Sequence, residues 1–202
     1  GKVLISNKFE DISAKINFTY KGFKNSKTKL GFEQANYNIS NSEDNNEGLT
    51  GNSLISKKNS ILNSFYIQNR LLFHNKSNIQ VGLRIENLEE NKKFYKSPRV
   101  SFNYNLNPNL SYEASIGKHY QFIHRQSKAN STIEKNFYWI ISSDTVPTLY
   151  STNFYNGFNF NNKSFILKGS LYYKSLKNLF INLHSEEFYL GTGNIKGLEI
   201  LL

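Results

Sequence analysis

The four histidines are the residues best suited to hold a metal ion, and their spacing does not favour such a site. His74, His119, His124 and His184 are scattered, and no pair has the spacing of a zinc-binding HExxH segment. Cysteine is absent, which excludes thiolate ligands, a thiol nucleophile and a disulfide scaffold. The sequence therefore predicts neither a metal centre nor a bound cofactor.

Acidic pairs and a glycine pair are the other groups that could support catalysis. Glu86, Glu89 and Glu90 form an acidic cluster, but without a pocket signal we expect a solvated loop tip rather than a glycosidase pair. The segment 191–193 reads Gly-Thr-Gly and lacks the Gly-Lys-Ser that a phosphate-binding loop needs. We therefore expect a protein that is not an enzyme.

The chain is strongly basic. Its 202 residues include 25 Lys and Arg against 15 Asp and Glu, a formal net charge of +10. The basic residues are spread among turns and loops rather than clustered on one element, so we expect no nucleic-acid partner. The charge is consistent with a solvated basic surface, or with loops that meet anionic ligands or lipopolysaccharide phosphates.

Apolar residues recur with a period of two, which is typical of β-strands. In the segment 12–20, one face would carry Ile12, Ile16 and Phe18 and the other would carry Lys15. The segments with the same alternation are 79–86, 100–106, 110–117, 154–160 and 165–174. The apolar parity changes between Leu30 and Ile39, which indicates either a β-bulge or a strand that leaves its apolar environment.

The connections between these segments alternate in length. Short polar turns are expected at 24–27, 74–78, 107–109 and 161–163, and long loops at 40–59, 87–97, 124–147 and 176–194. This order predicts an all-β, antiparallel up-and-down meander of about nine long strands, with the tight turns on one side. Strand length and loop asymmetry favour part of a transmembrane outer-membrane β-barrel over a soluble β-sandwich.

Several strings in the second half of the chain resemble the barrel of TonB-dependent outer-membrane receptors. Residues 98–115 are similar to a "PR-x-S-x-x-Y-x-L", turn, "L-S-x-x-A-S-Y" pair of strands, and residues 120–127 to a "Q-Y-I/L-H-x-x-S" stretch. Residues 171–179 resemble "AYYKKMKNL", and residues 191–202 resemble "G-x-G-x-S-Y-G-L-E-L-L-L", with Lys196 standing where the family usually has Tyr. The set occurs in the family's order.

The resemblance implies a barrel of about 22 strands around an N-terminal plug. Residues 1–202 would then be a partial barrel domain without the plug and the closing C-terminal strands. It also implies outer-membrane import of a scarce nutrient, such as a metal chelate, vitamin or oligosaccharide. The implied partners are outer-membrane lipid, the nutrient ligand, the TonB system acting through a plug, and a surface lipoprotein.

The resemblance and the alternation together predict where side chains face. Family position places His124 and Arg125 at the barrel mouth, and Tyr138 and Trp139 in the loop 124–147 are candidates for stacking on a ligand. The residues expected to face the lumen are Lys15, Arg84, Glu86, Glu113 and Lys168, and those expected to face lipid are Ile16, Leu83, Phe102, Ala114 and Leu171. Two alternatives remain open here: a secreted β-sandwich that binds carbohydrate, and a non-transporting outer-membrane barrel.

Overall fold

Alternating side chains place almost the whole chain in long antiparallel strands. The computed structural model describes residues 3–23, 25–45, 53–73, 76–130, 134–162, 164–182 and 188–202. The strands are β1 (Val3–Phe23), β2 (Ser26–Asn45), β3 (Ser53–Phe73), β4 (Ser77–Leu88), β5 (Phe94–Asn107), β6 (Leu110–Gln121), β7 (Ile123–Asn130), β8 (Glu134–Ile141), β9 (Leu149–Asn161), β10 (Ile166–Asn182) and β11 (Phe188–Leu201). Within those ranges, no helix is long and apolar enough to cross a membrane.

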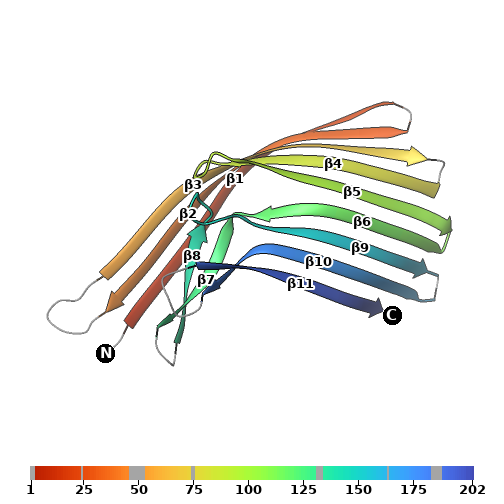
Figure 1. The fold of residues 1–202 in the computed structure, drawn as a ribbon. Helices are drawn as coiled ribbons and strands as arrows, with labels where there is room; N and C mark the ends of the chain where they lie inside the picture. Colours follow the sequence, from red (N-terminus) through yellow and green to blue (C-terminus); the bar gives the residue numbers. More distant parts are fainter. Residues whose placement is uncertain are drawn as a thin grey trace.

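Nine of the strands form one meandering sheet. Its order is β1-β2-β3-β4-β5-β6-β9-β10-β11, and each neighbouring pair is antiparallel. Figure 1 shows the turns that join β1 to β2, β3 to β4, β5 to β6 and β9 to β10 at the same end of the sheet. The expected antiparallel meander is confirmed, and the sandwich alternative is wrong because these nine strands make one sheet rather than two packed layers.

The remaining strands, β7 and β8, pair only with each other and form a hairpin between β6 and β9. This hairpin occupies much of the segment 124–147, for which the sequence predicted a loop. The other predicted loops are also shorter, because β2 extends to Asn45, β3 begins at Ser53 and β10 extends to Asn182. The sequence did not predict these extensions as strands, because they are rich in polar residues and lack the alternating apolar positions used to recognise a strand.

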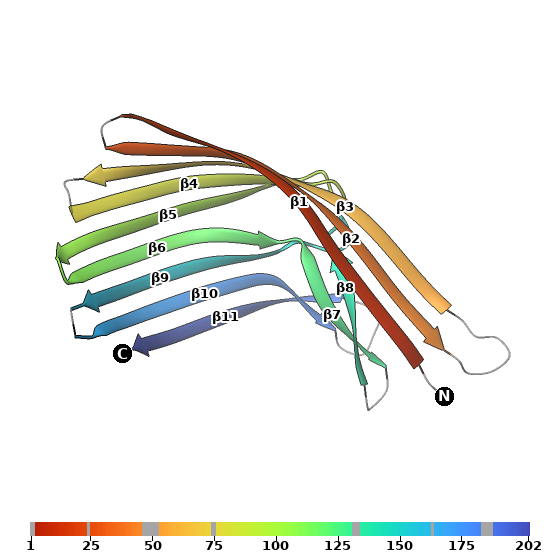
Figure 2. The ribbon, with the colours of Figure 1, turned by 180° about the vertical axis from the view of Figure 1, so that it is seen from behind.

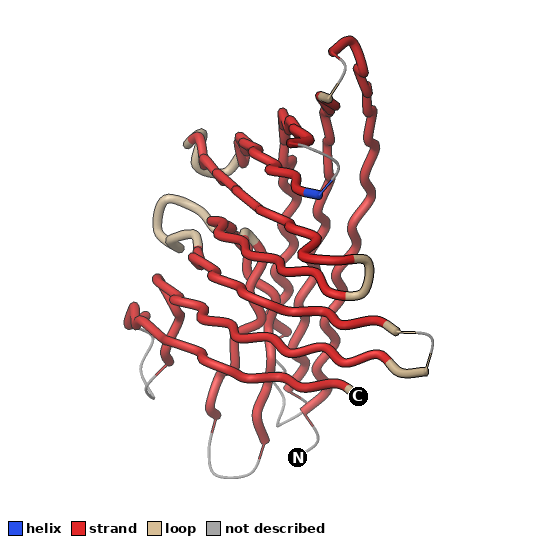
Figure 3. The backbone as a smooth tube through the Cα atoms, turned by 90° about the vertical axis from the view of Figure 1, so that its right-hand side faces the viewer, coloured by secondary structure: helices blue, strands red, loops and turns tan. Residues whose placement is uncertain are grey.

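The sheet is strongly curved, so it has a convex face and a concave face. Figure 2 shows the same sheet from behind, with β1 running in a different direction from β11 because the sheet coils, and Figure 3 shows the backbone from the side. The convex face carries large apolar side chains that are exposed, among them Ile16 (59 %), Phe18 (68 %), Phe158 (54 %) and Leu171 (59 %). The concave face carries polar and charged side chains over the same length of strand.

The inward-facing residues of β1 and β2 change character along the strands. Near the short turns they are polar, such as Lys15 and Glu33, and further along they are apolar, such as Phe9 and Ile39. The pairing of β1 with β2 is continuous from Val3↔Asn45 to Tyr20↔Thr28, so no bulge causes the change. The parity change seen in the sequence is instead a change of surroundings, because the β7–β8 hairpin covers the inner face at this end.

The small apolar core lies beneath that hairpin. It contains Ala35, Ile39, Leu62, Leu88, Phe122 and Ile141, each at most 5 % exposed. The hairpin lies across the concave side of the sheet: β8 contacts β1 and β2, and β7 contacts β10. It therefore links elements from the two halves of the meander, which are far apart in the sequence.

Candidate functional site

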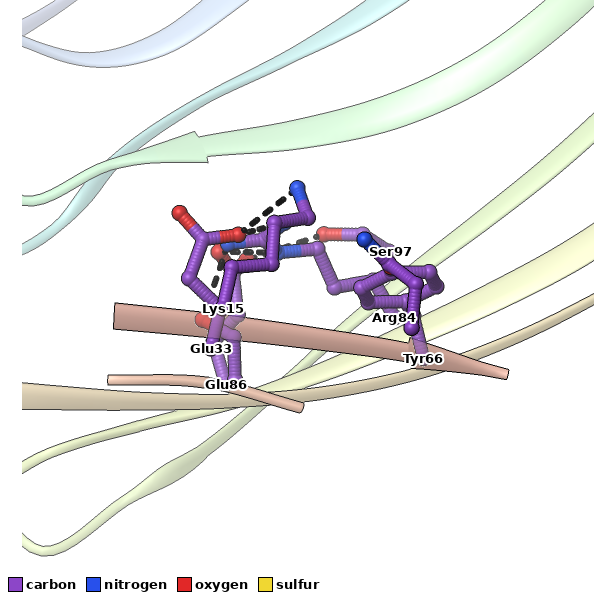
Figure 4. Close-up of polar contacts among 8 residues, drawn as sticks. Lys15, Glu33, Tyr66, Arg84, Glu86 and Ser97 are labelled. Carbon is purple, nitrogen blue, oxygen red and sulfur yellow. Dashed lines mark hydrogen bonds and ion pairs between the residues drawn. The ribbon is translucent and has the colours of Figure 1, made fainter. Parts of the chain in front are cut away.

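A network of charged and polar side chains crosses the concave face of β1 to β5 (Figure 4). We call Lys15, Glu33, Ser64, Arg84, Glu86 and Ser97 the inner polar network. The register of the sheet places Lys15 beside Glu33, Glu33 beside Ser64, and Ser64 beside Glu86. The two cations and two anions of the network balance each other in charge.

Arg84 is the centre of this network. Its guanidinium donates to Glu86 (Nε to Oε1, 2.9 Å), to Glu33 (3.2 Å) and to the hydroxyl of Ser64 (2.9 Å). Glu33 also pairs with Lys15 at 3.1 Å, and Glu86 accepts from the hydroxyl of Ser97 at 3.3 Å. Only a planar, multiply donating guanidinium can serve three acceptors in this way, so Arg84 fixes the positions of side chains on three strands.

Tyr66 lies on the concave face beside the inner polar network and contacts it through Lys15. Its ring lies over Gly31, its cross-strand partner, and its hydroxyl donates to Asn17. The Lys15 ammonium lies 5.3 Å from the centre of the Tyr66 ring. A Cβ atom at position 31 would overlap the ring, so glycine is what lets the tyrosine lie flat against the sheet.

A hollow of about 590 Å³ lies beside the network on the concave face. Its lining includes the cations Lys15, Lys29, Arg84 and Arg99, together with His119, and includes no carboxylate among the described residues. Gly117 lies beneath: a Cβ atom there would come within 3.2 Å of both Arg99 and His119. The hollow can therefore receive an anionic or strongly hydrogen-bonding group.

The hairpin is fastened to the sheet by Trp139. The side-chain amide of Asn41 on β2 donates to the backbone carbonyl of Trp139 (2.9 Å) and accepts from its backbone N–H (3.1 Å). The Trp139 ring packs against Phe9 of β1, with ring centres 5.2 Å apart. Asn41 is 8 % exposed, so this bond pair is shielded from water.

His124 fastens the other strand of the hairpin. Its Nε2 lies 3.0 Å from the hydroxyl of Ser142, and its ring centre lies 4.7 Å from that of Phe180 on β10. His124 is 5 % exposed. Burial disfavours the charged imidazolium and lowers the pKa of His124 to about 4.

A second cavity, of about 530 Å³, lies between the hairpin and the ends of β2 and β3. Tyr138 and Trp139 line it on the hairpin side, while Ile39 and Asn41 line it on the sheet side. Lys58 stands at this cavity and forms an ion pair with Glu90 at 2.8 Å. Apolar walls with two aromatic side chains and a few polar groups suit a small organic ligand.

The four residues predicted to bind ligand all lie on the hairpin, on opposite sides of it. Arg125 and Trp139 are cross-strand partners and share one side, whereas His124 and Tyr138 share the other. The residues predicted to face a lumen share the concave face: Lys15, Arg84 and Glu86 in the network, with Glu113 and Lys168 further round the sheet. Among the described residues, no His or acidic cluster could hold a metal, and His74 and His184 lie outside the described part.

Sequence reasoning missed Asn41 and Glu33. Asn41 stands in a stretch rich in polar residues, and nothing in its neighbourhood indicates that its amide meets a backbone 98 residues away. Glu33 could have been found, because it follows Phe32 in an alternating strand and so must face away from the apolar side.

Solved structures with this arrangement include receptors for ferric siderophores and an iron transporter. The ferric yersiniabactin uptake receptor FyuA of Yersinia pestis superposes on 98 % of the chain with a TM-score of 0.74 at 10 % identity. The ferric enterobactin receptor PfeA of Pseudomonas aeruginosa covers 96 % (TM-score 0.69, 13 % identity), as does the FrpB iron transporter of Neisseria meningitidis (TM-score 0.68, 13 % identity). No protein-family model and no curated protein matches the sequence.

The fold is that of the wall of a TonB-dependent receptor barrel. The chain spans about a third of each of those receptors: 33 % of FyuA, 33 % of PfeA and 32 % of FrpB. In this receptor-barrel fold, the convex apolar face corresponds to the outside of the wall and the concave face to the inside. The hairpin extends from the end opposite the short turns.

Proposed function

We propose that the chain is part of the wall of an outer-membrane receptor that imports a scarce nutrient, with iron chelates as the favoured class. The observation that carries the proposal is the contrast between the two faces of one sheet. Large apolar side chains are exposed on the convex face, and an ion-paired network lies on the concave face. A bilayer favours this arrangement, whereas water penalises it.

The wall would belong to a larger barrel. In the described part of the chain, β1 and β11 each pair on one side only, and an open edge in lipid leaves backbone groups unsatisfied. We therefore propose that residues 1–202 pair with further strands and surround a plug through which the TonB system acts. The coverage of about a third of each similar receptor supports this proposal.

We propose that the hairpin contributes to ligand binding. Trp139 and Tyr138 line the aromatic cavity, and exposed Arg125 lies beside Trp139 in the hairpin register. A cation beside an aromatic surface suits the anionic, aromatic groups that hold iron in many chelates. His124 would contribute by positioning the hairpin, because its ring packs against Phe180 of β10.

The membrane assignment can be tested with neighbouring residues of opposite orientation. Phe102 faces the convex side of β5 and Ser101 faces the concave side. The F102R variant should insert less well into the outer membrane, by about 2–4 kcal/mol near the bilayer midplane, while S101R inserts normally. Equal insertion of the two variants in a protease-protection assay would contradict a lipid-facing wall.

Transport needs its own experiment, carried out on the full-length protein that contains this chain. Iron-starved cells with and without the protein are given a radiolabelled ferric siderophore, and uptake is compared in the presence and absence of TonB. We expect TonB-dependent uptake in the cells with the protein. Normal outer-membrane insertion with no uptake of chelates, vitamins or oligosaccharides would favour the non-transporting barrel.

A further inference from the structure

One amide side chain lies within the apolar part of the convex face. The outward positions of β9 in this part of the sheet are Phe154, Asn156, Phe158 and Phe160. Asn156 is thus the single polar member of an otherwise aromatic series. Its neighbours in the same cross-strand row are Ala114 on β6 and Leu171 on β10. The Asn156 side chain is exposed, so it shares the outer surface of the wall with these apolar groups.

Apolar rows border Asn156 on both sides along the strands. The row nearer the short turns contains Phe158 and Ile200, and the row nearer the hairpin contains Ile116 and Phe154, each more than 40 % exposed. In the proposed membrane, this amide would lie at the depth of the lipid hydrocarbon, where neither water nor a headgroup can bond to it. A polar group at that depth is costly unless another protein group pairs with it.

The wall itself pairs only part of this amide. The Oδ1 atom of Asn156 accepts from the hydroxyl of Tyr112 at 2.8 Å. Within the described part of the chain, no acceptor bonds to its Nδ2 atom. Asn69, which also faces the convex side, shows the contrast, because its Nδ2 donates to the hydroxyls of Ser26 and Thr28 at 2.9 and 2.7 Å. The N–H groups of Asn156 therefore call for an acceptor outside the described residues.

The surface beside Asn156 is low enough for another chain to approach. Ala114 in its row carries only a methyl group. Gly169, in the adjacent row beside Phe158, has nothing within 4 Å of a Cβ position. Inside membranes, small residues let two protein segments come close, and side-chain amides then bond between them.

We propose that two copies of the full-length protein form a dimer in the membrane through this face, with Asn156 at the centre of the contact. A side-chain amide is its own complement, because it presents a donor beside an acceptor, and a two-fold axis would bring the two Asn156 amides together. Across the described parts of β6, β9, β10 and β11, the row of Asn156 and the row nearer the short turns carry no charge, so identical faces can meet without repulsion. The inference rests on the proposed function, because it requires the convex face to lie in lipid.

Cross-linking tests which faces meet. Residues 1–202 contain no cysteine, so a single introduced cysteine reports its neighbours once any cysteines outside these residues are replaced by serine. In isolated outer membranes treated with a short bismaleimide, A114C should give a cross-linked dimer of the protein. I79C is the matched control: it lies in the same outward row but on β4, two strands away from Ala114, and should remain monomeric.

The role of the amide is tested by N156L, which keeps the size of the side chain and suits lipid better, so the variant should still insert. We expect the dissociation constant of its dimer to rise ~25-fold, since each of two amide hydrogen bonds contributes about fivefold. The measurement is energy transfer between labelled copies in liposomes over a range of protein densities. G169L, whose side chain enters open space, should also weaken the dimer by holding the walls apart. I79W, equally bulky but distant from Asn156, should not.

Insertion of every variant is checked by protease protection. A wild type that inserts but stays monomeric at all densities, or an N156L variant that dimerises like the wild type, would overturn the inference and leave the membrane assignment intact. Cross-linking of A114C to a different protein would also overturn it, and would show that the amide meets another partner. If the wild type does not insert at all, the membrane assignment fails first and the inference fails with it.

Discussion

The side-chain amide of Asn41 and the backbone of Trp139 form two hydrogen bonds, 2.9 and 3.1 Å long. The amide presents a donor and an acceptor side by side, as a neighbouring strand would, and so it completes the free edge of β8 at this point. This contact and the packing of Trp139 on Phe9 determine where the hairpin rests on the sheet.

Replacing Asn41 should loosen the hairpin. N41L leaves the N–H and carbonyl of Trp139 without their partner, and we expect docking to weaken by about 1–3 kcal/mol. Trp139 is the only tryptophan in residues 1–202, so a red shift of its fluorescence reports the loss once any tryptophans outside these residues are replaced by phenylalanine. N36L, at an exposed position on the other face of β2, should leave the emission unchanged.

Acid should loosen the same hairpin through His124. Its pKa in the folded protein is about 4, below its ordinary value of 6.5, so the docked state favours the neutral ring. The undocked state therefore takes up a proton first, and the contribution to docking is lost as the pH falls from about 6.5 to 4. The fluorescence of Trp139 should follow this transition, and the H124Q variant should lack it.

Arg84 should be sensitive to substitution, including by lysine. Without the guanidinium, Glu33 and Glu86 lose their shared partner, and Glu86 is only 7 % exposed. We expect R84Q to lower the free energy of unfolding by about 2–3 kcal/mol in detergent, measured by urea titration. R84K should recover part of this loss, because an ammonium cannot reach all three acceptors at once.

Gly31 should tolerate no side chain while Tyr66 is present. G31A pushes the Tyr66 ring off the sheet, and we expect destabilisation of about 1–3 kcal/mol. The G31A/Y66A double variant should lose less than the sum of the two single changes, as a double-mutant cycle would show. G169A is the matched control, since nothing lies within 4 Å of a Cβ atom at that position.

The sequence predicted the sheet well because a sheet with one apolar face and one polar face requires a strict alternation along each strand. Ile16 and Lys15 are neighbours that must face opposite ways, and the pattern identifies both. It failed along β2, where Ala35 and Ile39 face inward, because the surroundings are supplied by a hairpin about 100 residues later. For the same reason, the burial of His124 against Phe180 could not be read from its neighbours in the chain.

The apolar underside of the hairpin makes undocking of the hairpin from the sheet costly. Lifting the hairpin would expose Phe122 and Ile141 to water, at about 1.5–3 kcal/mol for each side chain. Undocked forms are therefore scarce at equilibrium. Weakening the contact between the hairpin and Asn41 would make the undocked forms more common.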